Sequence, residues 1–322
     1  MDMNILLHLQ QFRNGCGGIF ADFLAKMTFF GELNTVLLIM AVVYWCFSKK
    51  LGTYLLMGWN ANRLINGFLK VTVCAYRPWI RDARIVPFGN SMATATGYSF
   101  PSGHATNAAS AYGGAMLWKS SSKTLRILLG IVVVLVPFSR IYLGVHTPQD
   151  ILCGAGLGLL MMWLTLKMMR QLELHPEKAR LVAGIGIALA VLLAVYAALK
   201  SYPRDLDANG KVLVDGAKMA NDSFKCAGWC AAFLLGGLLE RRFVDFSTDV
   251  PAGVKATRFA GGVLGFYAVS LILLPLVKSW IPGAAGTTVS CFIQMFWIAF
   301  LFPLIFKHFE KRSARPEGSR NV

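Results

Sequence analysis

The chain contains 322 residues, of which 56% are hydrophobic and only 15% charged, a balance that excludes an ordinary water-soluble enzyme. The formal net charge of +16 would suggest a nucleic-acid partner in a soluble chain, but the basic residues lie mostly in short loops between apolar runs. We therefore expect an all-α fold, a polytopic transmembrane helical bundle whose partner is the lipid bilayer, with no nucleic acid.

Residues 1–32 interleave apolar and charged side chains, and the segment is predicted to be an interfacial amphipathic helix. Apolar stretches near the length of a bilayer-spanning helix follow it. The predicted spans are 33–48, 51–76, 103–118, 124–143, 147–170, 181–199, 222–240, 258–278 and 286–307. We expect the first six to form a core over 33–199. The last three, with a basic tail, form an extension over 200–322.

Two polar connections interrupt this pattern. The segment 77–102 contains prolines and glycines that break a helix, and the segment 201–222 separates the core from the extension. When alternate loops are assigned to opposite faces, a modest majority of the 32 basic residues lies on the face opposite the 77–102 loop. The positive-inside tendency therefore predicts a multi-pass protein with this loop outside the cytoplasm, in the periplasm, the cell exterior or an organelle lumen. We expect a bacterial plasma membrane, with the active site on its extracytoplasmic face.

Three polar clusters lie at the edges of the predicted spans, where such residues are costly. The first, KVTVCAYRP, carries Lys70 and Arg77, which are seven residues apart and are predicted to share one helix face. Arg140 supplies a third cation. Taken singly, each of these is also typical of a basic side chain that extends to the membrane interface. Together they would repel one another unless they bind an anion, and a phosphoryl group suits arginine donors.

The second and third clusters contain histidines. His146 and Asp150 are four residues apart, a spacing at which the carboxylate can accept the ring N–H and leave the other nitrogen as a nucleophile or base. His104 begins the third predicted span. There Ser102 and Gly103 are expected to act as N-cap and first-turn residues that offer backbone N–H groups to an anion. These parts indicate phosphoryl transfer without a metal or cofactor.

The three clusters resemble a known family signature. Their pattern is K-x6-R-P at residues 70–78, P-S-G-H at 101–104, and S-R-x5-H-x3-D at 139–150. In residue type, spacing and order it is similar to the three-part signature of the type 2 phosphatidic acid phosphatase superfamily, in its integral-membrane branch. The resemblance is close over residues 63–155, and as a six-span core it extends over 33–199.

The resemblance implies a role for each site residue. His146 would be the nucleophile that forms a phosphohistidine, Asp150 would orient it, and His104 would protonate the leaving group and later activate water. Ser139 matches the signature without an assigned role. The implied phosphate-binding residues are Lys70, Arg77, Ser102, Gly103 and Arg140.

The function expected from these residues is hydrolysis of a membrane lipid phosphate or pyrophosphate at the extracytoplasmic face, with the 33–199 core as the catalytic part. Undecaprenyl pyrophosphate, phosphatidic acid and phosphatidylglycerophosphate remain open as substrates, with a preference for the polyprenyl compound. A phosphotransferase or a sugar-phosphate phosphatase using the same pocket is an alternative, as is a non-catalytic lipid-binding protein. A homodimer and the role of the last three spans are also left open.

Overall fold

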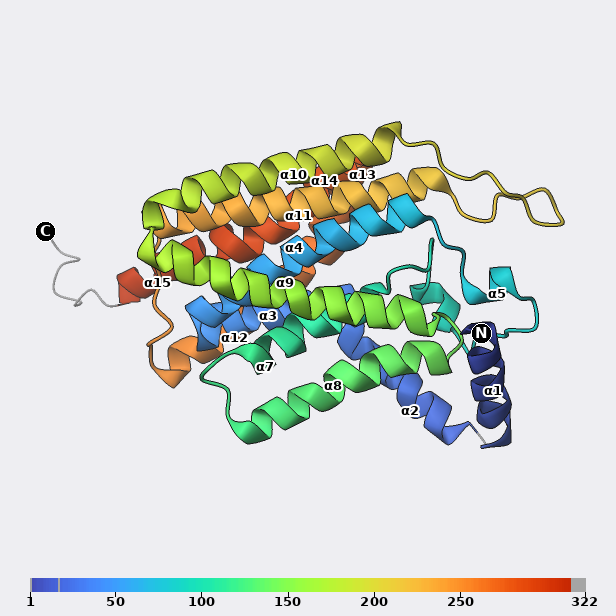
Figure 1. Ribbon diagram of the computed structural model, residues 1–322. Helices are drawn as coiled ribbons and strands as arrows, with labels where there is room; N and C mark the ends of the chain where they lie inside the picture. Colours follow the sequence, from blue (N-terminus) through green and yellow to red (C-terminus); the bar gives the residue numbers. More distant parts are fainter. Residues whose placement is uncertain (1, 17, 314–322) are drawn as a thin grey trace, which may run out of the picture.

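The computed structural model describes residues 2–16 and 18–313. Helices account for the regular structure of this part of the chain, and one isolated bridge between Leu206 and Val212 is its β pairing. The long helices lie side by side along the long axis of an elongated bundle (Figure 1). The predicted all-α helical bundle is confirmed. The end of the predicted basic tail, 314–322, lies outside the described residues.

The helices follow the predicted order. The N-terminal ones are α1 (Asp2–Gly15) and α2 (Ile19–Met27). Those of the predicted core are α3 (Leu33–Val42), α4 (Lys49–Val73), α5 (Pro78–Arg81), α6 (Gly103–Ala108), α7 (Gly114–Leu117), α8 (Lys123–Tyr142), α9 (Pro148–Leu174) and α10 (Ala179–Leu199). Those of the predicted extension are α11 (Gly216–Phe243), α12 (Ala252–Ala268), α13 (Leu274–Trp280), α14 (Gly283–Phe296) and α15 (Phe302–Ser313). Single π-helical turns continue α3 to Phe47 and join α6 to α7, α12 to α13 and α14 to α15.

Each predicted span coincides with one of these helices or joined pairs. Within the described chain, five helical segments are long and apolar enough to cross a membrane. They are Lys123–Tyr142, Pro148–Leu174, Pro176–Leu199, Ala252–Trp280 and Gly283–Lys311. Helices α4 and α11 are also long, with 25 and 28 residues, but carry polar side chains.

A sixth membrane-crossing segment is formed if two bent pieces count as one span. These are Ile19–Gly31 and Leu33–Phe47, which meet at an angle of 54°. The second half of the predicted interfacial segment is thus apolar enough to take part in a span, because Asp22 and Lys26 are the only charged residues of α2. This differs from the expectation that all of 1–32 lies at the interface.

The polar side chains of α4 point into the bundle, where they bind neighbouring helices. Asn62 donates from Nδ2 to Ser110 Oγ at 2.8 Å, and Asn66 donates from Nδ2 to Thr106 Oγ1 at 2.9 Å. Both asparagines are buried. Since a buried amide is costly without partners, these bonds explain how a polar helix occupies the centre of a membrane protein.

The extension packs directly on the core. Helix α11 lies against α4, α10 and α14, and Trp229 of α11 donates to Gln294 Oε1 at 3.0 Å. At a second contact between the two parts, Trp45 of the core donates to the carbonyl of Ile298 in the extension at 2.9 Å. One hydrophobic cluster joins residues of both parts, so α4 is enclosed between the signature-bearing helices and the extension.

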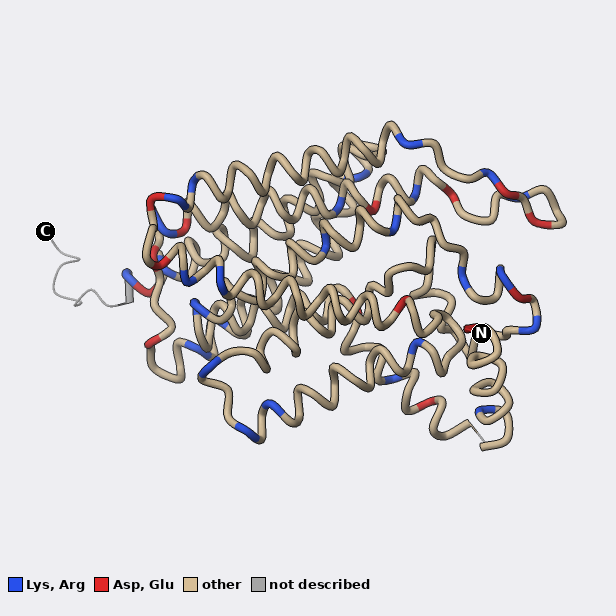
Figure 2. Tube along the Cα trace, in the orientation of Figure 1, with Lys and Arg blue, Asp and Glu red and all other residues tan. Residues whose placement is uncertain are grey.

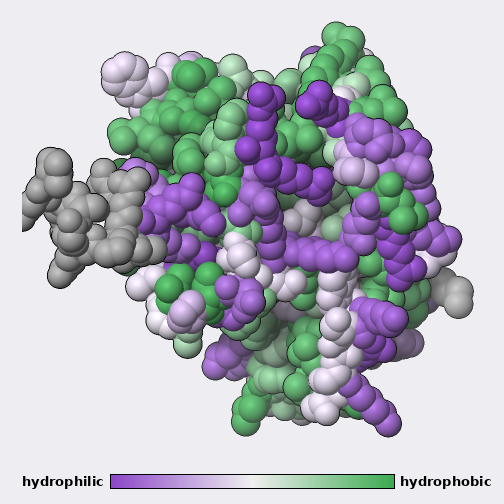
Figure 3. All heavy atoms as spheres, turned by 90° about the vertical axis from the view of Figure 1, so that its left-hand side faces the viewer, coloured by the Kyte–Doolittle hydropathy of each residue, from purple (hydrophilic) through white to green (hydrophobic). Residues whose placement is uncertain are grey.

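Charged residues are concentrated near the two ends of the helices, and the middle is mostly uncharged (Figure 2). The end opposite α5 presents hydrophilic side chains beside apolar ones (Figure 3). At the other end lie α1, α5 and the 201–215 connection (Figure 1). This distribution is typical of a protein whose middle faces hydrocarbon and whose ends face water.

Candidate active site

The 77–102 loop folds back over the end of α4. Helix α4 ends at Val73, and Cys74 adopts a left-handed conformation with φ 51°. Arg77 therefore lies outside this helix, as the residue before α5, where the following Pro78 disfavours helical backbone. The prediction that Lys70 and Arg77 share one helix face was wrong. The loop, rather than helical periodicity, brings them to the same site.

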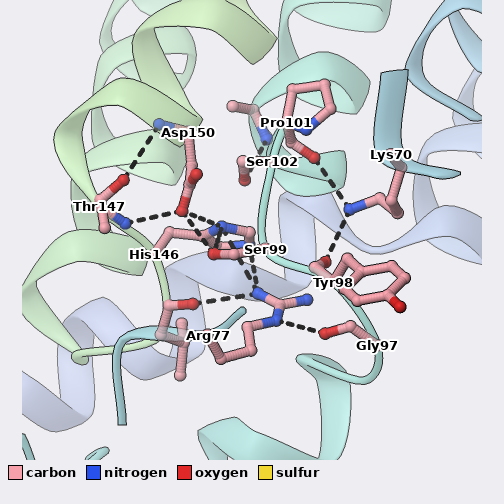
Figure 4. Close-up of polar contacts among 12 residues, drawn as sticks. Lys70, Arg77, Gly97, Tyr98, Ser99, Pro101, Ser102, His146, Thr147 and Asp150 are labelled. Atoms are coloured by element: carbon pink, nitrogen blue, oxygen red, sulfur yellow. Dashed lines mark hydrogen bonds and ion pairs between the residues drawn. The ribbon is translucent and has the colours of Figure 1, made fainter. Parts of the chain in front are cut away.

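Arg77 joins the loop to the segment before α9. It is 4% exposed and donates to the carbonyls of Gly97 at 3.0 Å, Thr96 at 3.2 Å and Val145 at 3.0 Å. Its Nη1 also lies 2.8 Å from His146 Nε2 (Figure 4). A guanidinium is only a donor. His146 Nε2 is therefore the accepting nitrogen of a neutral imidazole whose proton is on Nδ1.

Asp150 lies on the other side of that imidazole. His146 Nδ1 is 3.2 Å from Asp150 Oδ2, the same oxygen that accepts from the backbone N–H of Thr147 at 2.8 Å and from the hydroxyl of Ser99 (Figure 4). Thr147 and Asp150 form a capping box at the start of α9. The cap fixes the carboxylate, and the carboxylate in turn orients the ring.

The environment keeps His146 uncharged. Burial lowers the pKa of His146 well below its ordinary value, and the positive charge of Arg77 lowers it further, while the hydrogen bond and charge of Asp150 act in the opposite direction. The imidazole therefore keeps its Nε2 lone pair at neutral pH. This is the protonation state that a nucleophile requires.

The 101–104 turn begins α6 as the sequence predicted. Ser102 is the N-cap, its Oγ accepting from Ala105 N at 3.4 Å, and its own N–H donates to the carbonyl of Asp150 at 2.9 Å. Lys70 donates from Nζ to the carbonyls of Tyr98 and Pro101, both at 3.0 Å. These bonds hold the turn between α4 and α9.

A cavity of about 350 Å³ opens over this constellation. Five predicted residues line it, namely Lys70, Arg77, Gly103, His104 and His146. Three do not line it but adjoin lining residues: Ser102 precedes Gly103, Arg140 donates to Thr94, and Asp150 binds His146. Its remaining lining residues are Gly31, Glu32, Leu33, Asn34, Arg63, Asn66, Thr94, Thr96, Asn107 and Asp222.

Several buried nitrogen atoms at the site, on the side chains of Arg63, His104 and Arg140, have no hydrogen-bond partner among the described residues. Arg140 is fully buried and donates to Thr94 Oγ1 at 3.2 Å, but its Nε and Nη1 have no acceptor. His104 Nε2 is also buried and without a partner. Ser139, next to Arg140, donates to the carbonyl of Val136 at 2.7 Å. Since buried polar groups are nearly always hydrogen-bonded, these donors indicate a site for an anion.

Sequence reasoning missed two residues that build the site. Ser99 donates to Asp150 from the loop, and Arg13 of α1, only 5% exposed, donates to the carbonyl of Tyr142 at 3.0 Å and to that of Val86 at 2.7 Å. Neither residue belongs to a cluster in the sequence. Arg13 resembled an ordinary interfacial charge, and only the packing of α1 on the loop shows its partners.

The fold and site define a class of protein, a polytopic helical membrane protein with a cationic cavity that holds two histidines. The model of the PAP2 superfamily matches residues 34–173, and that of the PAP2 superfamily phosphatase transmembrane extension matches residues 224–315. The chain therefore belongs to the PAP2 superfamily, in its integral-membrane branch, and is a multi-pass integral membrane protein.

Individual relatives match parts of the chain. It is 35% identical over 121 residues to phosphatidylglycerophosphatase B of Bacillus subtilis (strain 168), covering 35% of this chain and 55% of the relative. It is 46% identical over 63 residues to an undecaprenyl-diphosphatase of Sulfolobus acidocaldarius, covering 20% of this chain and 30% of that relative. The matches thus span about half and about a third of these relatives.

One solved structure is also similar. It is the crystal structure of the first transmembrane PAP2 type phosphatidylglycerolphosphate phosphatase from Bacillus subtilis. The similarity covers 53% of this chain and 85% of that one at 27% identity and a TM-score of 0.44.

Proposed function

We propose that this protein hydrolyses a membrane lipid phosphate or diphosphate through a phosphohistidine intermediate, without a metal or cofactor. The observation that carries the proposal is a neutral His146 at a cationic cavity, with Arg77 on its Nε2 and Asp150 on its Nδ1. Supporting it, the curated relatives are named for activity on phosphatidylglycerophosphate and undecaprenyl diphosphate.

The cations bind the substrate phosphoryl group. Lys70 and Arg77 line the cavity, and Arg140 has two free donors behind it. Guanidinium groups bind two phosphate oxygens at once, so they orient the phosphorus as well as neutralise its charge. The phosphate oxygens accept the donors of Arg77, which releases the lone pair of His146 Nε2.

In the first step, His146 Nε2 attacks phosphorus and forms an N–P bond, while the bond from phosphorus to the leaving oxygen breaks. His104, which takes up a proton when the anionic phosphoryl group binds beside it and offsets the neighbouring cations, donates that proton to the leaving oxygen, so the lipid leaves protonated there and His104 becomes neutral. Asp150 stabilises the positive charge that the ring of His146 acquires. The side chain of His104 lines the same cavity and its Nε2 has no other partner, as this role requires.

In the second step, water attacks the phosphohistidine. His104, now neutral, accepts a proton from the water, the N–P bond breaks, and inorganic phosphate leaves with His146 neutral again. An alcohol in place of water would make the same site a phosphotransferase.

We propose that the site lies at the extracytoplasmic membrane surface. The cavity is lined by Lys70 near the end of α4, by Arg77 before α5 and by Gly103 at the start of α6, and α5 lies with α1 at one end of the bundle (Figure 1). From the sequence, a modest majority of the basic residues is assigned to the loops of the opposite face, which the positive-inside tendency assigns to the cytoplasm. A cavity at the ends of the helices admits a phosphorylated head group while the lipid tail stays in the bilayer.

The test is phosphate release by the purified protein in detergent and chelator. The panel is phosphatidic acid, phosphatidylglycerophosphate, undecaprenyl diphosphate and glucose 6-phosphate, with His146→Ala as the matched inactive variant. We expect turnover of at least one lipid, lost in the variant, and acid-labile phosphate on the wild-type protein after rapid quenching. Full activity in His146→Ala would disprove the mechanism. If phosphate leaves the lipid only when an alcohol is added, the protein is a phosphotransferase. If the folded protein turns over no substrate, it is a lipid-binding protein.

A further inference from the structure

A fourth cation lines the cavity beyond the three of the family signature. Arg63 is on α4, seven residues before Lys70 and so about 10 Å deeper along the helix axis. Its guanidinium carbon lies 5.9 Å from the ring centre of Trp59 and 5.7 Å from that of Trp229. Its Nη1 is 3.9 Å from the position that a Cβ on Gly103 would occupy. Arg63 therefore faces the start of α6 beside His104.

The charge of Arg63 is not neutralised by a carboxylate in the described chain. Its Nε is buried and has no partner, and its polar neighbour on α11 is the thiol of Cys226, a weak acceptor. Asp222 lines the same cavity, but its Oδ1 lies 2.6 Å from Lys225 Nζ. The two indoles fix the guanidinium by cation–π contact without consuming its donors.

The extension reaches this part of the cavity. Asp222, which lines the cavity, and Trp229, which contacts Arg63, are both on α11, which lies outside the six-span core and packs against α4. The extension thus contributes to the cavity itself and to the position of Arg63. This placement distinguishes Arg63 from Lys70, Arg77 and Arg140, which lie around the reacting phosphoryl group.

We infer that Arg63 binds the second phosphoryl group of a lipid diphosphate, in a subsite that α11 completes. The inference rests on the proposed hydrolase function and specifies its substrate class. When His146 attacks the terminal phosphorus, the bond to the bridging oxygen breaks and the leaving group is a lipid monophosphate. His104 protonates the bridging oxygen, and the remaining negative charge faces Arg63. A monoester instead releases an alcohol, which is neutral once protonated and gives Arg63 nothing to bind.

The experiment compares farnesyl diphosphate with farnesyl phosphate, which share one tail, as substrates of wild type and Arg63→Gln. We expect Arg63→Gln to lower kcat/KM for the diphosphate by about 10- to 100-fold, typical of a lost charged hydrogen bond, and for the monophosphate by less than about threefold. Arg204→Gln, the same change at an exposed position of the 201–215 connection, serves as the control and should alter neither. Trp229→Leu should show a smaller loss of the same selectivity.

The outcomes are distinct. Equal losses on both substrates, or no loss on either, would overturn the diphosphate subsite, and the activity retained on the monophosphate reports that the variant is folded. If wild type hydrolyses neither compound and none of the lipids of the panel above, the proposed function fails instead. In that case the thermal shifts caused by methylenediphosphonate and by inorganic phosphate are compared. A diphosphonate shift lost only in Arg63→Gln supports the subsite, and an unchanged shift overturns it.

Discussion

At the scale of single residues, the proposed mechanism requires that His146 be oriented, and the structure orients it from both sides. Arg77 approaches Nε2 from the 77–102 loop at 2.8 Å, and Asp150 approaches Nδ1 from the first turn of α9 at 3.2 Å. The carboxylate itself is held by the Thr147 backbone and by Ser99. Orientation and tautomer are therefore fixed before any substrate binds, which lowers the reorganisation needed in the reaction.

The first prediction concerns Asp150→Asn. The amide nitrogen cannot accept the Nδ1 proton of His146, so the ring turns or adopts the other tautomer and loses its Nε2 lone pair. We expect kcat to fall by about 10³- to 10⁴-fold, as in a histidine-carboxylate pair of a catalytic triad, with KM nearly unchanged. Steady-state kinetics with the preferred lipid measures both. A variant that raised KM alone would show that Asp150 acts in binding.

The second prediction concerns pH. Because burial and Arg77 lower the pKa of His146, the neutral imidazole persists as the pH falls below about 6.5, its ordinary pKa. The acid limb of kcat/KM should therefore lie below that pH. Arg77→Gln removes a charge that lowers this pKa, so the limb should move upward. The ionisation of the substrate is the same in both proteins and cancels in the comparison. A downward or absent shift would contradict the assignment.

At the scale of elements, the site depends on how closely α9 approaches the start of α6. A Cβ on Gly154 would lie 2.7 Å from the carbonyl oxygen of Ser102 and 3.2 Å from Thr106 Oγ1. The same turn receives a hydrogen bond from Lys70 at Pro101. Helices α4, α6 and α9 thus meet at one point. The positions of His104 and His146 follow from this contact.

The third prediction tests that contact. Gly154→Ala forces the 101–104 turn away from α9, since the atom it meets is backbone, and we expect a loss of at least about tenfold in kcat with a destabilisation of about 1–3 kcal/mol from overpacking. Gly156→Ala is the matched control on the same helix, because a Cβ there meets nothing within 4 Å. Activity and thermal unfolding measure the two effects. Equal behaviour of the two variants would contradict the proposed helix contact.

At the scale of the whole molecule, the extension is joined to the core at both ends of the bundle. Near the site, α11 supplies Asp222 to the cavity wall, and its Trp229 packs against the guanidinium of Arg63. At the opposite end, Arg258 forms two hydrogen bonds with Glu310 at 2.7 and 2.9 Å and donates to the carbonyl of Trp45 at 3.1 Å. The ion pair therefore connects α12, α15 and the core far from the catalytic residues.

The fourth prediction concerns Arg258, whose ion pair lies far from the site. Arg258→Met leaves the carboxylate of Glu310 without its partner, and we expect a destabilisation of about 3 kcal/mol, the lower end for a broken buried ion pair, because the side chain of Glu310 is 27% exposed. At a temperature where the variant is folded, kcat/KM should stay within about twofold of wild type. Thermal unfolding in detergent and kinetics check both parts. A large kinetic effect in folded protein would show coupling between the two ends.

The amino-acid sequence by itself determined the helical membrane class, the order of the helices and the three signature clusters. Hydrophobic runs and residue spacing are local properties, which makes them readable from one chain. The pairing of His146 with Asp150 was also readable, because four residues separate them and a capping box fixes their geometry.

Only the tertiary structure decided which distant residues meet. Lys70 and Arg77 converge through a folded loop rather than along one helix. Ser99 reaches the site, and Arg13 the 77–102 loop, from segments without any motif. Arg63 meets Trp229 of the extension. Such contacts depend on packing between segments far apart in the chain. The periodicity of a single segment carries no information about which partner covers its polar face.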